Sequence, residues 1–328
     1  MTEKSRRLWL LKDECKKAGA NCVVITNAIM NEGKNPNFFW LTNCNYGSVF
    51  YWEFRDNPRI IANSIEAPLC RKAWVKCEIG NVEDILKSMH GMAAFDASHT
   101  NVNFYNKINA KPFDVSDKFR NFRRTKSGYE IKCIKRACDI TGSIFSEVFR
   151  MQKGKTERRI FSFARMKIAE MGLEEAFDPI VASGSNIRSP HHIPTDKRHK
   201  GALLVDLGVR FGGYCSDVTR TYGSSYTRIG EKIHEKLKEV IREGVSCAEA
   251  DKVSRQAMGT LAKTFVTSLG HGIGISVHED PRVSSKSNDI LKKGDVITIE
   301  PGIYLKNGMR LENVYLVGKN KCDNLTDW

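Results

Sequence analysis

The sequence has 328 residues, of which 41% are hydrophobic and 27% are charged, and its formal net charge is +14. This length is typical of about two domains, and the composition is that of a globular protein, which excludes wholesale disorder. No apolar run approaches the ~20 residues that a membrane span needs. The short apolar patch at residues 8–11 does not form a secretory signal, so we expect a cytoplasmic protein with no membrane partner.

The ten cysteines show neither a C-x-x-C pair nor the dense spacing of a disulfide framework. In a chain without a secretory signal, cysteines spaced in this way are usually reduced. We therefore expect free, mostly buried thiols and no zinc ribbon.

The excess of positive charge is concentrated in three short clusters. Basic clusters can bind nucleic acid or another anionic partner, but no aromatic side chains alternate with them here. We therefore expect a solvated basic surface rather than a nucleic-acid site. The clusters are Arg123, Arg124 and Lys126; Lys153, Lys155, Arg158 and Arg159; and Lys197, Arg198 and Lys200.

The first part of the chain alternates strand-like and helix-like segments, which predicts a compact α/β domain without a chemical motif. The charged stretch 119–126 is expected to be irregular and marks the boundary, giving domains at 1–122 and 123–328. The predicted strands are 22–26, 48–54, 59–62 and 92–95, and the predicted helix is 82–89.

The second domain opens with a helix signal. Ser127 and Glu130 have the spacing of a capping box, and apolar residues follow at helical intervals. Two further helices are predicted at 156–171 and 230–243, each closed by a glycine. The stretches between and after them are rich in strand-forming residues.

Two aspartates flank a turn signal at Phe211-Gly212-Gly213. A hairpin centred between Phe211 and Gly212 places Asp206 opposite Asp217, and directly opposed residues share a face. Two carboxylates at such a short distance repel each other unless a cation or a proton lies between them. The alternative is a pair of solvated aspartates, which the apolar sequence around Asp206 disfavours.

Two glutamates, Glu300 and Glu312, lie symmetrically about a second turn at 306–308. Glu300 ends an apolar strand at Pro301, and a buried carboxylate needs a partner. Arg310 is one candidate partner for either glutamate, in which case the pair is a plain salt bridge.

The histidines form two further candidates. His271 lies between two glycines, so its ring has little packing of its own and a ligand role is plausible. His278 follows seven residues later, and the two rings can meet only if the strand bends at the glycines. His191 and His192 lie in a loop between prolines, where a surface role is the alternative.

Together these residues offer four carboxylates and an imidazole, an oxygen-rich set that suits two clustered divalent cations and not a tetrahedral structural zinc. Such paired cations activate a water molecule and polarise a carbonyl group. The H-E-x-x-H and G-x-S-x-G motifs are absent.

The motifs D-L-G, S-D-x-T-R-T, G-H-G-I-G, H-E-x-P-R, I-E-P-G-I-Y and R-x-E occur in that order. In this pattern, residues 123–328 resemble the pita-bread metallopeptidases, which include methionine aminopeptidase, aminopeptidase P, prolidase and creatinase. The N-terminal part is similar to the creatinase and prolidase N-terminal domain in size and alternation. The resemblance implies an α+β fold, with a creatinase-like α/β domain followed by a pita-bread catalytic domain.

The resemblance also implies a role for each residue. Asp206 binds one metal, Asp217 and Glu312 bridge both, and His271 and Glu300 complete the second site. Glu300 also takes up and returns a proton. The residues that the resemblance assigns to the substrate are His278, His191, Arg282, which pairs with the free carboxylate of a dipeptide, and Arg310.

The function that the resemblance implies is hydrolysis of the bond before proline in Xaa-Pro dipeptides, as in prolidase. Two divalent cations per subunit are implied, Mn or Co first, with Fe and Zn also suited, and a homodimer. One alternative is an Xaa-Pro aminopeptidase acting on longer peptides. Another is a metal-free module that binds RNA or protein. The chain departs from the family pattern at Thr267, where a histidine is frequent, and at Asn313, where an aspartate is usual.

Overall fold

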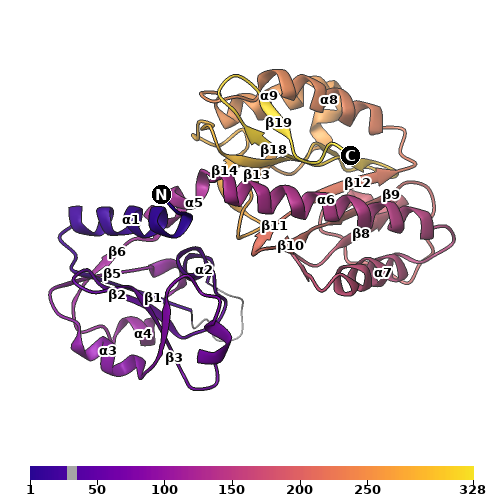
Figure 1. The fold of residues 1–328 in the computed structure, drawn as a ribbon. Helices are drawn as coiled ribbons and strands as arrows, with labels where there is room; N and C mark the ends of the chain where they lie inside the picture. Colours follow the sequence, from indigo (N-terminus) through magenta and orange to yellow (C-terminus); the bar gives the residue numbers. More distant parts are fainter. Residues whose placement is uncertain (28–34) are drawn as a thin grey trace. The chain divides into compact units, whose positions relative to one another are not determined.

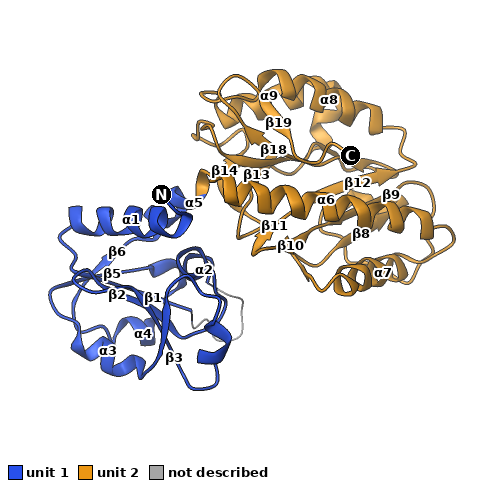
Figure 2. Ribbon diagram, in the orientation of Figure 1, with its two compact units in different colours: residues 1–123 blue, residues 124–328 orange. Residues whose placement is uncertain are grey.

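The computed structural model describes residues 1–27 and 35–328. The chain forms two compact units, residues 1–123 and 124–328 (Figure 2). Within the described residues, no helix is long and apolar enough to cross a membrane. All ten cysteines are free and eight of them are buried, as the sequence predicted.

Unit 1 is built on one six-stranded mixed sheet, with strand order β4-β3-β2-β1-β5-β6 (Figure 1). Strand β1 is buried along its whole length, and it pairs antiparallel with β2 and parallel with β5. The four predicted strands and the predicted helix are confirmed. The strands are β1 (Cys22–Thr26), β2 (Val49–Glu53), β3 (Arg59–Ala62), β4 (Lys76–Ile79), β5 (Met92–Phe95) and β6 (Lys111–Asp114).

Helices cover this sheet, and five α-helices lie in the described part of the unit. They are α1 (Glu3–Lys17), α2 (Pro36–Thr42), α3 (Val82–Ser88), α4 (Val102–Tyr105) and α5 (Ser116–Arg124). The expectation of an irregular stretch at 119–126 was wrong, because α5 continues to Arg124. On the apolar side of α5, Phe119 is fully buried, and its ring centre lies 6.0 Å from that of Trp40. The density of basic residues in the sequence concealed this short amphipathic helix.

The first basic cluster is also not solvated. Arg123, Arg124 and Lys126 are each less than a tenth exposed. Arg124 forms ion pairs with Asp289 and Asp295, and Lys126 pairs with Glu279 at 3.0 Å. The expectation of a solvated surface was therefore wrong for this cluster, and the ion-pair partners of Arg124 and Lys126 lie more than 150 positions away in the sequence. All the basic residues of the other two clusters are exposed, as the sequence predicted.

Unit 2 combines four helices with several small antiparallel sheets. Helix α6 (Gly128–Met151) begins with the predicted capping box, in which Ser127 and Glu130 cap each other, and it packs along β10, β11 and β12. Helix α7 (Glu157–Glu170) begins after Thr156, as expected. The remaining helices are α8 (Thr227–Val240) and α9 (Cys247–Met258).

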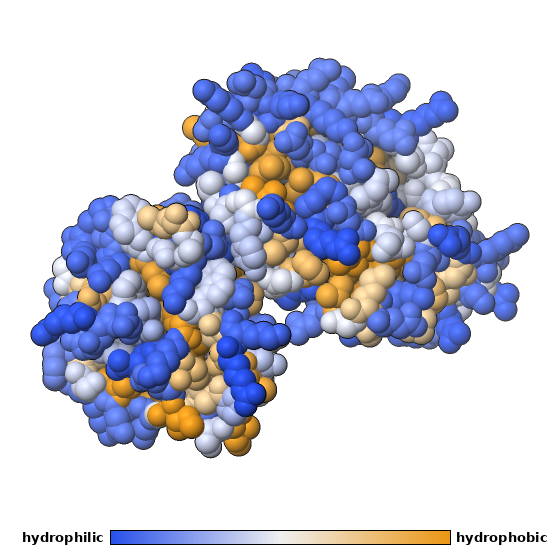
Figure 3. All heavy atoms as spheres, viewed as in Figure 1, coloured by the Kyte–Doolittle hydropathy of each residue, from blue (hydrophilic) through white to orange (hydrophobic). Residues whose placement is uncertain are grey.

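Helices α8 and α9 pack with their apolar sides on a five-stranded sheet, with strand order β14-β13-β15-β18-β19. Their outer surfaces are hydrophilic (Figure 3). Helix α8 ends before Ile241, which is extended and fully buried, so the predicted range 230–243 was three residues too late. Helix α9 was not predicted, although Ser246 caps it by accepting a hydrogen bond from the Glu249 amide.

The strands of unit 2 are short, and most of them pair antiparallel. Sheet β12-β9-β8 and the short sheet β11-β10-β7 lie beside α6 and α7, and β16 pairs with β17. The strands are β7 (Glu174–Glu175), β8 (Ile180–Ser183), β9 (Leu203–Leu207), β10 (Val209–Phe211), β11 (Tyr214–Cys215), β12 (Val218–Tyr222), β13 (Gly270–Gly272), β14 (Glu279–Val283), β15 (Val296–Ile299), β16 (Gly302–Ile303), β17 (Met309–Arg310), β18 (Asn313–Val317) and β19 (Cys322–Asn324).

Candidate metal centre

The two aspartates lie on one face of the β9–β12 hairpin. The predicted register was wrong by two residues, because Asp206 lies opposite Thr219 and not opposite Asp217. The turn is centred between Gly212 and Gly213, which both have positive φ angles, 57° and 85°, that favour glycine. Asp217 is two residues from Thr219 and so shares its face. The shared face that the sequence predicted is therefore retained.

The two glutamates lie opposite each other. Strands β15 and β18 pair Ile299 with Asn313, and β16 and β17 pair Gly302 with Arg310. These flanking pairs share one register, which places Glu300 opposite Glu312 as predicted. The turn between them contains Asn307 in the left-handed conformation, with φ 56°.

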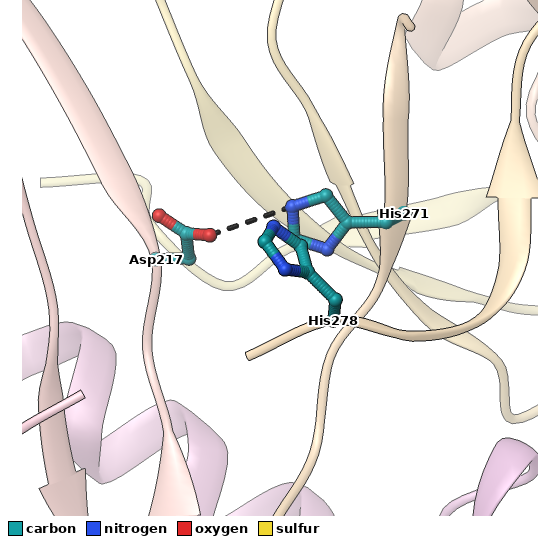
Figure 4. Close-up of side chains that lie close together, drawn as sticks. All are labelled: Asp217, His271 and His278. Atoms are coloured by element: carbon teal, nitrogen blue, oxygen red, sulfur yellow. Dashed lines mark ion pairs between the residues drawn. The ribbon is translucent and has the colours of Figure 1, made fainter. Parts of the chain in front are cut away.

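The histidines converge because β14 returns along β13 after a loop. The rings of His271 and His278 lie 4.3 Å apart, nearly perpendicular to each other. The glycines beside His271 allow the neighbouring backbone to approach closely: a Cβ atom at Gly270 would lie 1.9 Å from the Thr298 carbonyl oxygen. Figure 4 shows the two rings next to each other, with the His271 ring directed toward Asp217.

All five residues predicted to bind metal lie together. One group of ligand atoms belongs to Asp206, Asp217 and Glu312, and within it all atoms are within 4.8 Å of one another. A second group, with the same spread, belongs to His271, Glu300 and Glu312. Glu312 is common to both groups. His271 Nε2 lies 3.5 Å from Asp217 Oδ2 and 3.6 Å from Glu300 Oε1.

The carboxylates of this cluster oppose one another's charge. Burial and the neighbouring carboxylates raise the pKa of Asp217 and of Glu300 well above the usual range. Burial and Asp206 raise the pKa of Glu312 to about 8. Fully ionised, the four carboxylates and the Arg310 guanidinium would carry a net charge of −3, so the cluster is suited to divalent cations.

Two details support cation binding by these residues. The Asp206 Oδ1 atom is buried and accepts no hydrogen bond from the described residues, although such an atom normally has a partner. Burial lowers the pKa of His271 to about 3, with His278 as a further cause. The His271 ring is therefore neutral at pH 7, which is the form that binds a metal. Its Nδ1 lies 3.0 Å from the Gly272 carbonyl oxygen.

Arg310 contacts an aspartate and not a glutamate. Its Nη2 lies 2.6 Å from Asp206 Oδ2, and its Nε donates to the Thr219 hydroxyl. The interpretation of Arg310 as a salt-bridge partner of Glu300 or Glu312 was therefore wrong, because the hairpins place it against β12. It is almost fully buried.

The sequence reasoning missed Thr219. Its hydroxyl donates to Glu312 Oε2 at 2.8 Å and accepts from Arg310, so it fixes the orientation of both side chains. A signal was available, because Thr219 follows Asp217 by two positions and must share its face.

The loop that carries His191 is held by Glu157. His191 is exposed, and its proximity contributes, after burial, to the lowered pKa of His278. The next residue, His192, lies with Nε2 2.8 Å from Glu157 Oε2. Glu157 also accepts hydrogen bonds from Ser183, Asn186 and Thr195. This hub too was missed, because its partners lie 26 to 38 positions away.

Arg282 lines a pocket of about 670 Å³ whose lining includes none of the five predicted ligand residues. The departure Thr267 lines the same pocket, and its hydroxyl lies 3.3 Å from the Tyr304 hydroxyl. The departure Asn313 is buried and accepts hydrogen bonds from Arg220 and Thr326. The Asn313 Oδ1 atom therefore has hydrogen-bond partners, although asparagine lacks the negative charge of the usual aspartate.

The sequence of residues 132–319 matches the model of metallopeptidase family M24. The chain belongs to this family. The M24 chain is 38% identical over 237 residues to an Xaa-Pro dipeptidase of Pyrococcus horikoshii, covering 67% of this chain and 68% of the relative.

Solved structures of related proteins share the fold of the M24 chain. The prolidase of Pyrococcus horikoshii matches with a TM-score of 0.88 and 28% identity over 98% of each chain. The X-Pro aminopeptidase of Thermotoga maritima matches with a TM-score of 0.85 and 25% identity, over 96% of this chain and 98% of the other. These matches confirm the predicted α+β fold with its two-domain pita-bread architecture, and the chain is a metallopeptidase.

Proposed function

We propose that this metallopeptidase hydrolyses the peptide bond before proline, with Xaa-Pro dipeptides as its preferred substrates. The observation that carries the proposal is the buried cluster of four carboxylates and a neutral imidazole, in two ligand groups that share Glu312. The Xaa-Pro dipeptidase and prolidase names of the relatives support the substrate class. Proline offers no N–H to a peptidase, so a dedicated pocket is required.

In this proposal Asp206, Asp217 and Glu312 would hold one divalent cation, and His271, Glu300, Glu312 and Asp217 would hold the other. Manganese and cobalt are the first choices for so oxygen-rich a set. When bound, the cations polarise a carbonyl group and make water a nucleophile at neutral pH.

The protein's own residues move the proton and orient the substrate. The Glu300 carboxylate accepts the proton of the attacking water and returns it to the proline nitrogen, which leaves as an amine. His278 and His191 donate hydrogen bonds to the substrate carbonyl as negative charge grows on its oxygen. Arg310, held by Asp206 and Thr219, orients that aspartate. Arg282 pairs with the substrate's free carboxylate.

The proposal is tested by stripping the protein of metal, reloading it with Mn²⁺ or Co²⁺, and offering Ala-Pro, Ala-Pro-Ala and Met-Ala-Ala. We expect metal-dependent cleavage of Ala-Pro above the other two. Glu312→Gln should lower kcat/KM by at least about 100-fold, since removing even an outer partner of a metal ligand costs 10–100-fold. The matched control is Glu235→Gln, an exposed glutamate on α8, which should leave kcat/KM unchanged.

Preference for Ala-Pro-Ala would move the assignment to an Xaa-Pro aminopeptidase and remove the carboxylate role from Arg282. Metal binding without cleavage of any substrate would refute the peptidase proposal.

A further inference from the structure

Among the described residues, the pocket that contains Arg282 is lined mostly by cationic and hydroxyl-bearing side chains and by no acidic one. Five of its ten lining residues carry a hydroxyl group, and three are cationic. The lining residues are Arg255, Phe265, Val266, Thr267, Ser268, Arg282, Ser284, Ser285, Lys286 and Ser287. Such a lining favours an anion that accepts several hydrogen bonds.

Two of the three cations are available to a ligand. Within residues 1–27 and 35–328, the side chains of Arg282 and Lys286 have no ion pair or hydrogen bond. Arg255, in contrast, is engaged: its Nε lies 2.7 Å from Asp251 Oδ2, and it donates to the carbonyl oxygens of Phe265 and Thr267. Arg255 therefore supports the wall of the pocket, while Arg282 and Lys286 provide uncompensated charge.

Asp289, an acid beside the pocket, does not neutralise that charge. Asp289 accepts a hydrogen bond from Ser287 at 3.4 Å, but it already forms an ion pair with Arg124 at 2.8 Å. The pocket thus remains electropositive.

The pocket is joined to the candidate metal centre by short steps. Arg282 is the strand partner of His271. On the other wall, the Thr267 hydroxyl meets the Tyr304 hydroxyl, which accepts a hydrogen bond from Arg310 at 3.3 Å, and Arg310 pairs with Asp206. In the proposed function Arg282 pairs with the free carboxylate of the substrate, so this pocket lies on the carboxyl side of a peptide bound at the metal centre.

The size and the charge of the pocket exceed the needs of one carboxylate. A volume of about 670 Å³ lies in the range of pockets that hold whole small ligands. We propose that the pocket binds an acidic residue that follows proline, so that Xaa-Pro-Glu and Xaa-Pro-Asp peptides are substrates beside the dipeptides. Arg282 and Lys286 share the two carboxylates of that residue, and the serine hydroxyls complete their hydrogen bonds. This inference rests on the proposed cleavage before proline.

The test compares binding of the leaving-side dipeptides Pro-Glu and Pro-Gln to the Mn²⁺-loaded full chain by isothermal titration calorimetry. We expect Pro-Glu to bind about fivefold more tightly at low salt, the factor typical of one partly exposed ion pair. Lys286→Gln should abolish this preference. Lys263→Gln, which removes an exposed lysine outside the lining, should preserve it.

Equal binding of Pro-Glu and Pro-Gln would overturn the inference. Tighter binding of inorganic phosphate than of Pro-Glu would also overturn it, because the pocket would then take a free anion. The hydrolysis of Ala-Pro-Glu and Ala-Pro-Gln separates this inference from the proposed function. Cleavage of both at equal kcat/KM refutes the pocket assignment alone. Binding of Pro-Glu that depends on Lys286, without cleavage of Ala-Pro or of either tripeptide, supports the affinity of the pocket for the acidic residue and refutes the peptidase assignment.

Discussion

Asp217 is the residue whose charge the rest of the site opposes most directly. It is buried, and Glu312, Asp206 and Glu300 all raise its pKa after the effect of burial. In the metal-free protein, the ionised side chain is therefore unfavourable for folding, whereas with bound cations it becomes a source of stability. A single substitution at this position should thus have opposite effects in the two states.

Asp217→Asn should raise the melting temperature of the metal-free protein by about 2–4 °C, the shift expected for a gain of about 1 kcal/mol in a unit of this size. It should also reduce the further rise that Mn²⁺ produces in the wild type. Differential scanning fluorimetry in EDTA and in MnCl₂ measures both effects. The control is Asp323→Asn, an exposed aspartate on β19. A variant that melts below the wild type in EDTA would contradict this account of the cluster.

Arg310 and Thr219 show how neutral and cationic groups stabilise part of this charge. Burial raises the pKa of Asp206, and the positive charge of Arg310 opposes that rise. Thr219 lies between Arg310 and Glu312 and serves both as donor and as acceptor. One ligand side chain from each hairpin is thereby fixed in orientation by groups that do not themselves belong to the ligand set.

At the scale of elements, Glu157 connects the start of α7 with the loop that carries His191. Burial alone would raise its pKa, but hydrogen bonds from His192, Asn186 and Ser183 lower the pKa of Glu157 to about 2. A carboxyl group with a lowered pKa in the folded state stabilises the fold above its unfolded pKa of 4.5. That stability is lost as the pH falls from about 4.5 toward about 2.

Glu157→Gln should therefore lower the free energy of unfolding at pH 7 by about 3 kcal/mol, the equivalent of the shift in pKa. The difference between variant and wild type should shrink as the pH falls toward 2, because the wild-type carboxyl group becomes protonated. Urea unfolding followed by circular dichroism at pH 7, 5 and 3 measures it. Thr195→Val tests one of the donors to Glu157 and should cost less than the removal of the charge. A difference that stays constant between pH 7 and pH 3 would rule out the carboxylate as its cause.

The sequence predicted those elements whose signals are local. The capping box at Ser127 and the symmetric turn between Glu300 and Glu312 depend on residues a few positions apart, and both are confirmed. The register of the first hairpin was wrong because either of two adjacent positions can centre a turn that contains Gly212 and Gly213. In the structure both glycines have positive φ angles, which places the centre of the turn between them. These angles are set by the pairing of the whole hairpin and cannot be read from the turn residues alone.

What the sequence could not provide was the set of partners across long separations. The Glu157 hub, the buried basic cluster and the contact of Arg310 with Asp206 each depend on tertiary packing. The predicted ligand residues do lie together, because two hairpins and a bent strand present them from one domain. Their roles remain part of the proposed function.

At the scale of the whole molecule, the net charge of +14 is divided between two environments. Arg124 is buried and paired with Asp295, which is fully buried and also accepts a hydrogen bond from the Lys292 amide. Arg158 is mostly exposed, and so is its partner Asp196. Breaking a buried pair leaves an uncompensated charge in the protein interior, whereas an exposed pair is already solvated.

Asp295→Asn should therefore lower the free energy of unfolding by about 3–5 kcal/mol, because Arg124 keeps its charge without its main partner. Asp196→Asn, the matched change in the exposed pair, should lower it by less than about 1 kcal/mol. Urea unfolding of both variants at 0.15 M salt measures the contrast, and a repeat at 1 M salt should affect only the exposed pair. Equal losses in the two variants would mean that Arg124 is stabilised by Asp289 and the Ile290 carbonyl oxygen alone, both of which it also contacts.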